Sequence, residues 1–172
     1  MQRKTTRISK QTSSQKDALY TMEVFIIGGP VSEKFIERNP VISRTIEIQG
    51  DQTLEDFHHA IFDAFEREEE HMYEFQIGGK GPNDPKAKRY VLAEEFENPV
   101  EETKPKGDVS KTTISSLKLK LNESFGYWFD FGDDWRHQIN VISIKEEIPT
   151  GEYPRVINRV GESPPQYPDL DE

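Results

Sequence analysis

Histidine and aspartate side chains recur along the sequence, and together they could bind a metal ion or move a proton. The candidates for catalysis are His71, His137 and Asp130, and those for a metal ion are His71, His137 and Asp133. Imidazole nitrogens and carboxylate oxygens from separate elements are common donors in divalent metal sites. A histidine paired with an aspartate near neutral pH would also suit general base catalysis.

The same residues have a purely structural alternative. His137 would then be a hydrogen-bonded histidine of the core, and the aspartates would form a turn and one cross-strand pair. No nucleophile stands in a recognisable catalytic setting, and the chain contains no cysteine. We therefore predict no cofactor, with a divalent metal ion as the alternative. Of the other histidines, His59 is expected on the polar side of a helix and His58 at the border of its apolar face.

A β-hairpin over residues 125–144 is expected to position most of these side chains. Aromatic and apolar residues alternate there in two runs, which are Phe125, Tyr127, Phe129 and Phe131, then Trp135, His137, Ile139 and Val141. Alternation at period two gives each strand one apolar face. A three-residue loop, Gly132 to Asp134, would pair Phe131 with Trp135 and keep the two apolar faces together. On the opposite face it would pair Asp130 with Arg136.

The hairpin also carries the candidate binding residues, which are Trp128, Trp135, Asp133 and Asp134. Trp128 is expected on the face opposite the aromatic core. There it is either covered by the proline-rich C-terminal segment or exposed as an anchor for a partner.

The remaining elements predict the fold class. Beside the hairpin, strands are predicted over residues 20–28, 41–49, 72–78 and 88–93. The clearest helix has an apolar stripe formed by Leu54, Phe57, Ile61, Phe62 and Phe65. Thr53 and Asp56 at its start have the spacing of a capping box. We predict an α+β fold with a mostly antiparallel, curved sheet of about five to six strands and one main helix packed on it.

Three regions are expected along the chain. Residues 1–16 should be a disordered basic tail, because they are rich in serine, threonine and glutamine and nearly free of apolar residues. Residues 17–148 should form the α+β domain, with residues 94–111 as a loop. Residues 149–172 hold five of the eleven prolines, so we expect them to pack on or near the domain without regular structure.

Charge and composition narrow the classes of partner. Five of the 22 basic residues fall within residues 1–16, so the rest of the chain sets 17 basic residues against 32 acidic ones, a net charge of −15. Such a body repels nucleic acid and anionic membranes, so the expected partner is an unknown protein or small ligand. No apolar run is long enough to span a membrane, and the lack of cysteine fits a cytoplasmic protein.

The hairpin motif resembles the signature of the plasmid pRiA4b ORF-3-like family. The matching residues are Tyr127, Phe129-Asp130-Phe131-Gly132-Asp133-Asp134-Trp135, His137 and Ile139. Thr53-Leu54 with Phe57-His58, and His71-Met72-Tyr73-Glu74-Phe75, are similar to further family motifs. Tyr73, however, stands where the family usually has a second histidine. The resemblance implies an α+β fold with a curved sheet and a packed helix. It implies no reaction, because the family, whose members include passengers of mobile elements, has no established one.

Two functions follow as hypotheses. The first is a non-catalytic interaction or binding module, which would use the face around Trp128 or the groove beside the main helix. The alternative is a metal-dependent hydrolase or nucleic-acid-processing enzyme that uses the histidine and aspartate cluster. Tyr73 and the acidic body favour the first.

Overall fold

The computed structural model describes residues 17–99 and 104–169 of the 172-residue chain. In that part, eight strands form one sheet: β1 (Leu19–Gly28), β2 (Ser43–Gln49), β3 (Tyr73–Ile77), β4 (Lys88–Val91), β5 (Gly107–Asp108), β6 (Ser124–Phe129), β7 (Trp135–Lys145) and β8 (Arg155–Val160). The helices of that part are α2 (Glu33–Arg38), α3 (Leu54–Ala64), α4 (Ala93–Glu97) and the short 3₁₀ helix η1 (Ser115–Leu117). The predicted tail, residues 1–16, lies outside the described residues.

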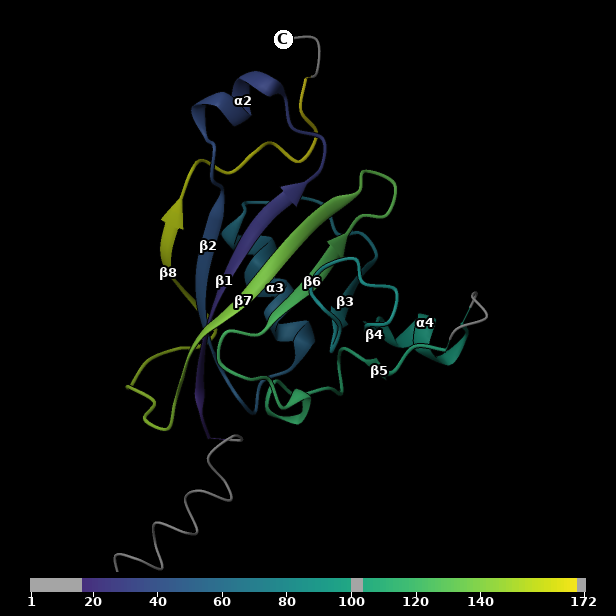
Figure 1. Cartoon of the computed structure of the whole chain (residues 1–172), viewed down its shortest axis with the longest axis vertical. Helices are drawn as coiled ribbons and strands as arrows, with labels where there is room; N and C mark the ends of the chain where they lie inside the picture. Colours follow the sequence, from purple (N-terminus) through teal and green to yellow (C-terminus); the bar gives the residue numbers. More distant parts are fainter. Residues whose placement is uncertain (1–16, 100–103, 170–172) are drawn as a thin grey trace, which may run out of the picture.

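The sheet has the strand order β5-β4-β3-β6-β7-β1-β2-β8, and only the pair β4–β5 is parallel. The predicted α+β class and the mostly antiparallel sheet are therefore confirmed (Figure 1). The predicted count of five to six strands is wrong, because β5 and β8 were not expected. Both are edge strands, where short or proline-flanked segments are tolerated and leave little pattern in the sequence.

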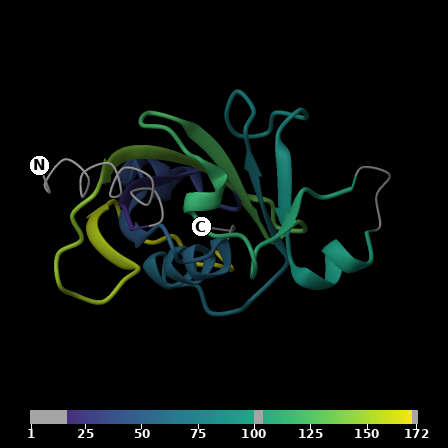
Figure 2. The ribbon, with the colours of Figure 1, turned by 90° about the horizontal axis from the view of Figure 1, so that it is seen from below.

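Helix α3 lies against one face of the sheet (Figures 1 and 2), and its apolar side chains belong to the core between them. Leu54, Phe57 and Ile61 are fully buried along this stripe. The predicted capping box is present, since the Thr53 hydroxyl accepts from the Asp56 amide at 3.1 Å and the Asp56 carboxylate accepts from the Thr53 amide at 2.9 Å. The cap satisfies two amides at the start of the helix and thereby fixes where α3 begins.

One main helix was predicted, whereas the part of the chain that the structure describes has three α-helices. Helix α2 lies between β1 and β2, in the stretch that separates the predicted strands 20–28 and 41–49. Helix α4 begins at the last residue of the predicted strand 88–93 and continues into the segment 94–111 that was predicted as a loop, where β5 also lies. Helices α2 and α4 have six and five residues, too short for a clear period of 3.6, and β5 has two, too short for alternation. Across residues 17–99 and 104–169, no helix combines the length and apolar character that a membrane crossing needs.

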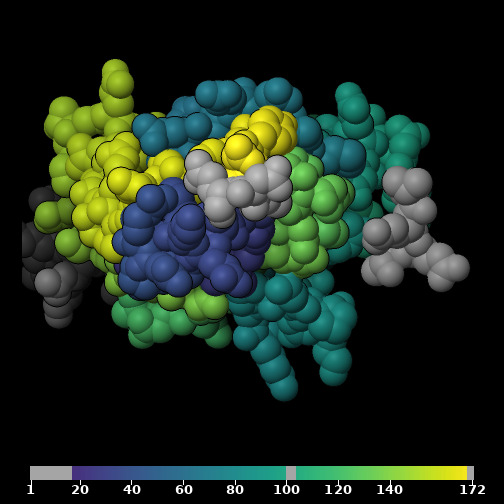
Figure 3. Space-filling model, turned by 90° about the horizontal axis from the view of Figure 1, so that it is seen from above, coloured from purple at the N-terminus to yellow at the C-terminus, as the bar shows by residue number. Residues whose placement is uncertain are grey.

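The C-terminal segment adds a strand and then crosses the surface between α2 and the residues after α3 (Figure 3). The prediction of no regular structure in residues 149–172 is wrong for β8, because residues 155–160 contain no proline and pair with β2. Beyond β8, the Glu162 amide donates to Asn39 at 2.9 Å. The Gln166 side chain bonds the backbone of Glu68 and Glu69 at 2.8–3.0 Å. These bonds hold the segment to the domain.

Candidate functional site

The hairpin of β6 and β7 has a different register from the predicted one. Phe129 pairs with Trp135 and Tyr127 with His137, so the connecting loop has five residues, Asp130 to Asp134. The predicted three-residue loop and its pairing of Phe131 with Trp135 are therefore wrong. The shift is two residues, which leaves the core face of each strand unchanged because side chains alternate with period two.

Two aspartates close this longer loop. Asp130 and Asp134 have φ angles of 57° and 63°, in the left-handed region that aspartate enters more readily than most residues. The Asp134 amide donates to the Asp130 carbonyl at 2.6 Å, and the Asp130 amide donates to the carbonyl of Met72 at 2.8 Å. The loop therefore bends away from the strand pattern one residue before Phe131, and Asp130 does not face Arg136.

Trp128 lies on the outer face of the hairpin, half-buried, and it is covered by side chains of the hairpin itself. The Phe131 ring lies 4.2 Å from its ring and the Arg136 guanidinium 4.2 Å from its ring centroid. Its indole nitrogen donates to the Asp134 carboxylate at 2.7 Å. Of the two alternatives for Trp128, cover by the C-terminal segment is wrong: these three side chains cover the ring, while that segment bonds residues near α2 and α3.

The other predicted binding residues separate into two groups. Trp135 is fully buried in the core and therefore cannot contact a partner in this conformation. Asp133 and Asp134 lie in the loop near the surface, where the Asp134 carboxylate also accepts from Arg136 at 2.8 Å. Of the four candidates, Trp128 and the two aspartates are at the surface.

His137 is a buried core histidine with a cation as its neighbour. Its Nδ1 donates to the Tyr127 carbonyl at 3.0 Å, and its Nε2 accepts from Arg67 at 2.8 Å. A guanidinium can only donate, so this pattern requires the neutral imidazole. The arginine guanidinium lies about 5 Å from the ring centres of Phe65, Phe129 and Trp135. Burial lowers the pKa of Arg67 to about 10.

The environment of His137 predicts a specific pH dependence. Burial lowers the pKa of His137 well below its ordinary value, and the positive charge of Arg67 lowers it further. The bond from His137 to the Tyr127 carbonyl acts in the opposite direction but is the smaller effect. The unfolded chain takes up a proton near pH 6.5, whereas the folded chain does not. Stability should therefore fall as the pH drops below about 6.5, by at most about 1.4 kcal/mol per pH unit for this group. Urea unfolding at pH 7.5, 6.5 and 5.5 measures this slope.

A second buried histidine, His58, also contributes to that slope. His58 lies close to His137, and burial lowers its pKa too, although its bond to Glu70 opposes the shift. Its contribution to the slope therefore has the same sign. An NMR titration separates the two residues, and a His137 midpoint at or above 6.5 would contradict the buried, neutral assignment.

His71 and Asp130 are brought together, but His137 does not join them. The His71 Nε2 lies 3.4 Å from the Asp130 carboxylate and 2.7 Å from the Tyr167 hydroxyl. The Asp133 amide donates to Asp130 at 3.3 Å. Within the part of the chain that the structure describes, these predicted side chains do not place three donor atoms within 4.8 Å of one another. His137 instead has Arg67 before its Nε2, a position where a metal ion would meet a positive charge.

A groove on the outer side of the sheet holds a group of residues that sequence patterns did not single out. It has a volume of about 970 Å³ and lies over β3 and β4. Its cationic residues are Lys86, Lys88, Arg89, Lys104, Lys106 and Arg136, and its acids are Glu74 and Asp84. Apart from Arg136, the basic residues come from two short runs, 86–89 and 104–106, in a chain of net charge −10. These basic runs in an otherwise acidic chain are the sequence feature from which the groove could have been predicted.

The parallel pairing of β4 with β5 brings the two basic runs together. The Lys106 amide donates to the Arg89 carbonyl at 2.7 Å, which aligns residues 104–106 beside β4. Arg89 itself is neutralised by Glu74 at 3.3 Å and Glu95 at 3.6 Å. The four lysines are exposed, and none of them has an ion pair within 4.0 Å to another residue of the described part. The groove therefore carries uncompensated positive charge.

The loop between β3 and β4 forms one wall of the groove. A side chain at Gly126 would meet the Gln76 side chain at 2.9 Å and Pro82 at 3.0 Å, so the loop approaches β6 closely. The Asp84 carboxylate accepts the amides of Lys86 and Lys80 at 2.9 and 2.7 Å, which fixes the loop. These bonds give the wall a defined shape although it is at the surface.

The comparisons with known proteins agree with this fold. The structure is similar to the crystal structure of a protein of unknown function, MM3350, from Methanosarcina mazei Go1, with a TM-score of 0.65 and 23% identity. That similarity covers 87% of this chain and 73% of the other. No curated protein matches the chain. The sequence pattern of the plasmid pRiA4b ORF-3-like proteins matches residues 34–167, and the chain belongs to that family.

Proposed function

We propose that the protein is a non-catalytic binding module whose groove takes an acidic segment of a partner protein. The observation that carries this proposal is the position of four exposed lysines, Lys86, Lys88, Lys104 and Lys106, around one groove of an acidic protein. Complementary charge steers a partner to such a patch, while the acidic remainder of the surface repels it elsewhere.

The chemistry of the groove favours an extended acidic chain. Lysine ammonium groups on flexible stems act as point charges, and they suit a series of carboxylates better than one rigid planar ligand. At the edge of the groove, Arg136 lies on the Trp128 ring, with the two groups 4.2 Å apart. This contact and the ion pair with Asp134 at 2.8 Å hold the Arg136 side chain in place at that edge. A nucleic-acid backbone would extend beyond the groove over the acidic remainder of the surface, whereas a short acidic segment can lie within the groove. The net charge of −15 beyond residue 16 therefore disfavours nucleic acid more than a short peptide.

The alternative of a metal-dependent hydrolase or nucleic-acid-processing enzyme has less support in this geometry. It needs His71, His137 and an aspartate around one ion, whereas His137 is bonded to Arg67 at 2.8 Å. His71 and Asp130 alone form a partly exposed pair. A binding module requires no such cluster.

Fluorescence polarisation with a labelled peptide of ten glutamates tests the proposal at low ionic strength. The double variant Lys86→Glu/Lys88→Glu should bind the peptide at least about tenfold more weakly, because each reversal replaces an attraction with a repulsion. The matched control is Lys111→Glu/Lys120→Glu, which makes the same charge change at two exposed lysines outside the groove. Its affinity should stay close to that of the unchanged protein.

Three outcomes would overturn the proposal in different ways. A lack of binding by the unchanged protein excludes acidic peptides. Equal losses in the two double variants indicate a general effect of net charge instead of a groove. Stronger competition by inorganic phosphate or by a single-stranded oligonucleotide than by unlabelled peptide would assign the groove to phosphate groups.

A further inference from the structure

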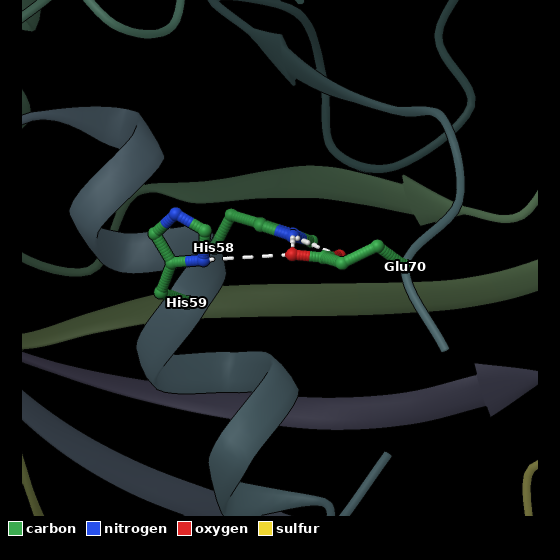
Figure 4. Close-up of side chains that lie close together, drawn as sticks. All are labelled: His58, His59 and Glu70. Atoms are coloured by element: carbon green, nitrogen blue, oxygen red, sulfur yellow. Dashed lines mark hydrogen bonds and ion pairs between the residues drawn. The ribbon is translucent and has the colours of Figure 1, made fainter. Parts of the chain in front are cut away.

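Two consecutive histidines of α3 and one glutamate after the helix lie together, on the side of the sheet that α3 covers (Figure 4). The Nε2 of His58 is 2.8 and 3.1 Å from the two carboxylate oxygens of Glu70. The Nδ1 of His59 is 3.5 Å from the same carboxylate. The three donor atoms lie within 4.8 Å of one another. None of these residues was among the metal candidates predicted from the sequence.

His58 is held rigidly. Its side chain is 1% exposed, and its ring stacks on that of Tyr73 with the centroids 3.6 Å apart and the planes within 5°. Its Nδ1 is 2.6 Å from the buried hydroxyl of Tyr127. When Nδ1 donates its proton to this hydroxyl, Nε2 presents its lone pair towards Glu70. A hydrogen bond behind the ligating ring that fixes its tautomer and direction is typical of histidines that bind metal ions.

We propose that His58 Nε2, His59 Nδ1 and the Glu70 carboxylate bind a divalent ion of the zinc type. Two imidazoles and one carboxylate form a donor set that zinc accepts in four-coordinate sites with one open position. Bonds of about 2.0–2.1 Å in a tetrahedron place two ligand atoms about 3.3 Å apart. The separations of 2.8 to 3.5 Å between the histidine nitrogens and the carboxylate oxygens lie close to that value.

The exposed members of the set can make the remaining adjustment. The side chains of His59 and Glu70 are 57% and 51% exposed, so they can move by a fraction of an ångström without disturbing the core. Their exposure also leaves the fourth position of the ion to water. The site therefore combines one rigid ligand, His58, with two ligands that can adjust, His59 and Glu70, and it leaves one coordination position open to water.

Isothermal titration calorimetry with Zn²⁺ tests the site, using full-length, tag-free protein stripped of metal with EDTA. We expect one ion per chain. His59→Gln and Glu70→Gln each remove a ligand at an exposed position, so they should fold normally and weaken binding by at least about tenfold. Tyr127→Phe removes only the bond behind His58 and should weaken binding by about tenfold. Titration with Co²⁺ should give the intense visible absorption of a four-coordinate ion.

His71→Gln is the matched control. It makes the same chemical change one residue from Glu70, at a histidine bonded to Tyr167 and Asp130 instead, and it should leave the affinity unchanged. The proposal fails if the unchanged protein does not bind Zn²⁺ at millimolar concentration, or if His59→Gln and Glu70→Gln bind as tightly as it does. It also fails if His71→Gln loses as much affinity as they do, which would place the ion beside Asp130.

Discussion

Replacing Phe129 with alanine should lower the free energy of unfolding by about 3–5 kcal/mol, the usual cost of truncating a buried phenylalanine. Phe129 is fully buried between β3 and β7, where its backbone pairs with those of Tyr73 and Trp135. The centroid of its ring lies 6.1 Å from that of Phe62 and 4.9 Å from the Arg67 guanidinium. The truncation therefore opens a cavity at the centre of the aromatic core. Urea unfolding at pH 7.5 measures the loss.

Phe96→Ala is the control for that experiment, because it deletes the same atoms from the short helix α4, where the side chain is 41% exposed. Its cost should stay within about 0.5–1 kcal/mol, as for most surface positions. A small domain has only about 5–15 kcal/mol of stability, so the difference between the two variants should be plain in the thermal midpoint as well. Equal costs would show that Phe129 does not lie in a packed core.

The hairpin shows what alternation in a sequence determines and what it leaves open. The core faces of β6 and β7 follow from the alternating residues, and the buried Phe129, Trp135 and His137 agree with them. The register does not follow, because a shift of two residues satisfies the same alternation. It depends on Asp130 and Asp134, which adopt left-handed backbone angles and lengthen the loop. Nothing in the alternation indicates that Phe131 belongs to the loop.

The surroundings of His137 and His58 were harder to predict, because they depend on contacts between residues far apart in the sequence. Arg67 occurs within an acidic run after α3, where an arginine is expected in solvent, but the fold buries it among aromatic rings next to His137. His58 was expected at the border of the apolar face of its helix. Its bond to Tyr127 joins residues 69 positions apart, and only the sheet topology brings them together.

Arg67→Ala should cost about 3–5 kcal/mol, for two separable reasons. The change leaves a cavity between the rings of Phe65, Phe129 and Trp135, which loses packing. It also removes the donor to His137 Nε2, and a buried acceptor without a partner costs about 1–3 kcal/mol. Urea unfolding at pH 7.5 again measures the sum of the two effects.

Arg67→Met separates them. Methionine refills most of the cavity. It also removes a buried, charged guanidinium whose Nη1 has no hydrogen-bond partner among the described residues. The methionine variant should therefore lose only about 1–3 kcal/mol, the cost of the unsatisfied His137 nitrogen. Its His137 should also titrate at a higher pH than in the unchanged protein, because the neighbouring positive charge contributes to the lowered pKa of His137.

Arg159→Ala, at an exposed position of β8, is the control, and it should change stability by no more than about 0.5 kcal/mol. If alanine and methionine at position 67 cost the same, packing of the arginine stem does not stabilise the fold. If the methionine variant leaves the His137 titration unchanged, the guanidinium does not act on that imidazole in solution. Either result would contradict the arrangement in which Arg67 fills the aromatic cage and keeps His137 neutral.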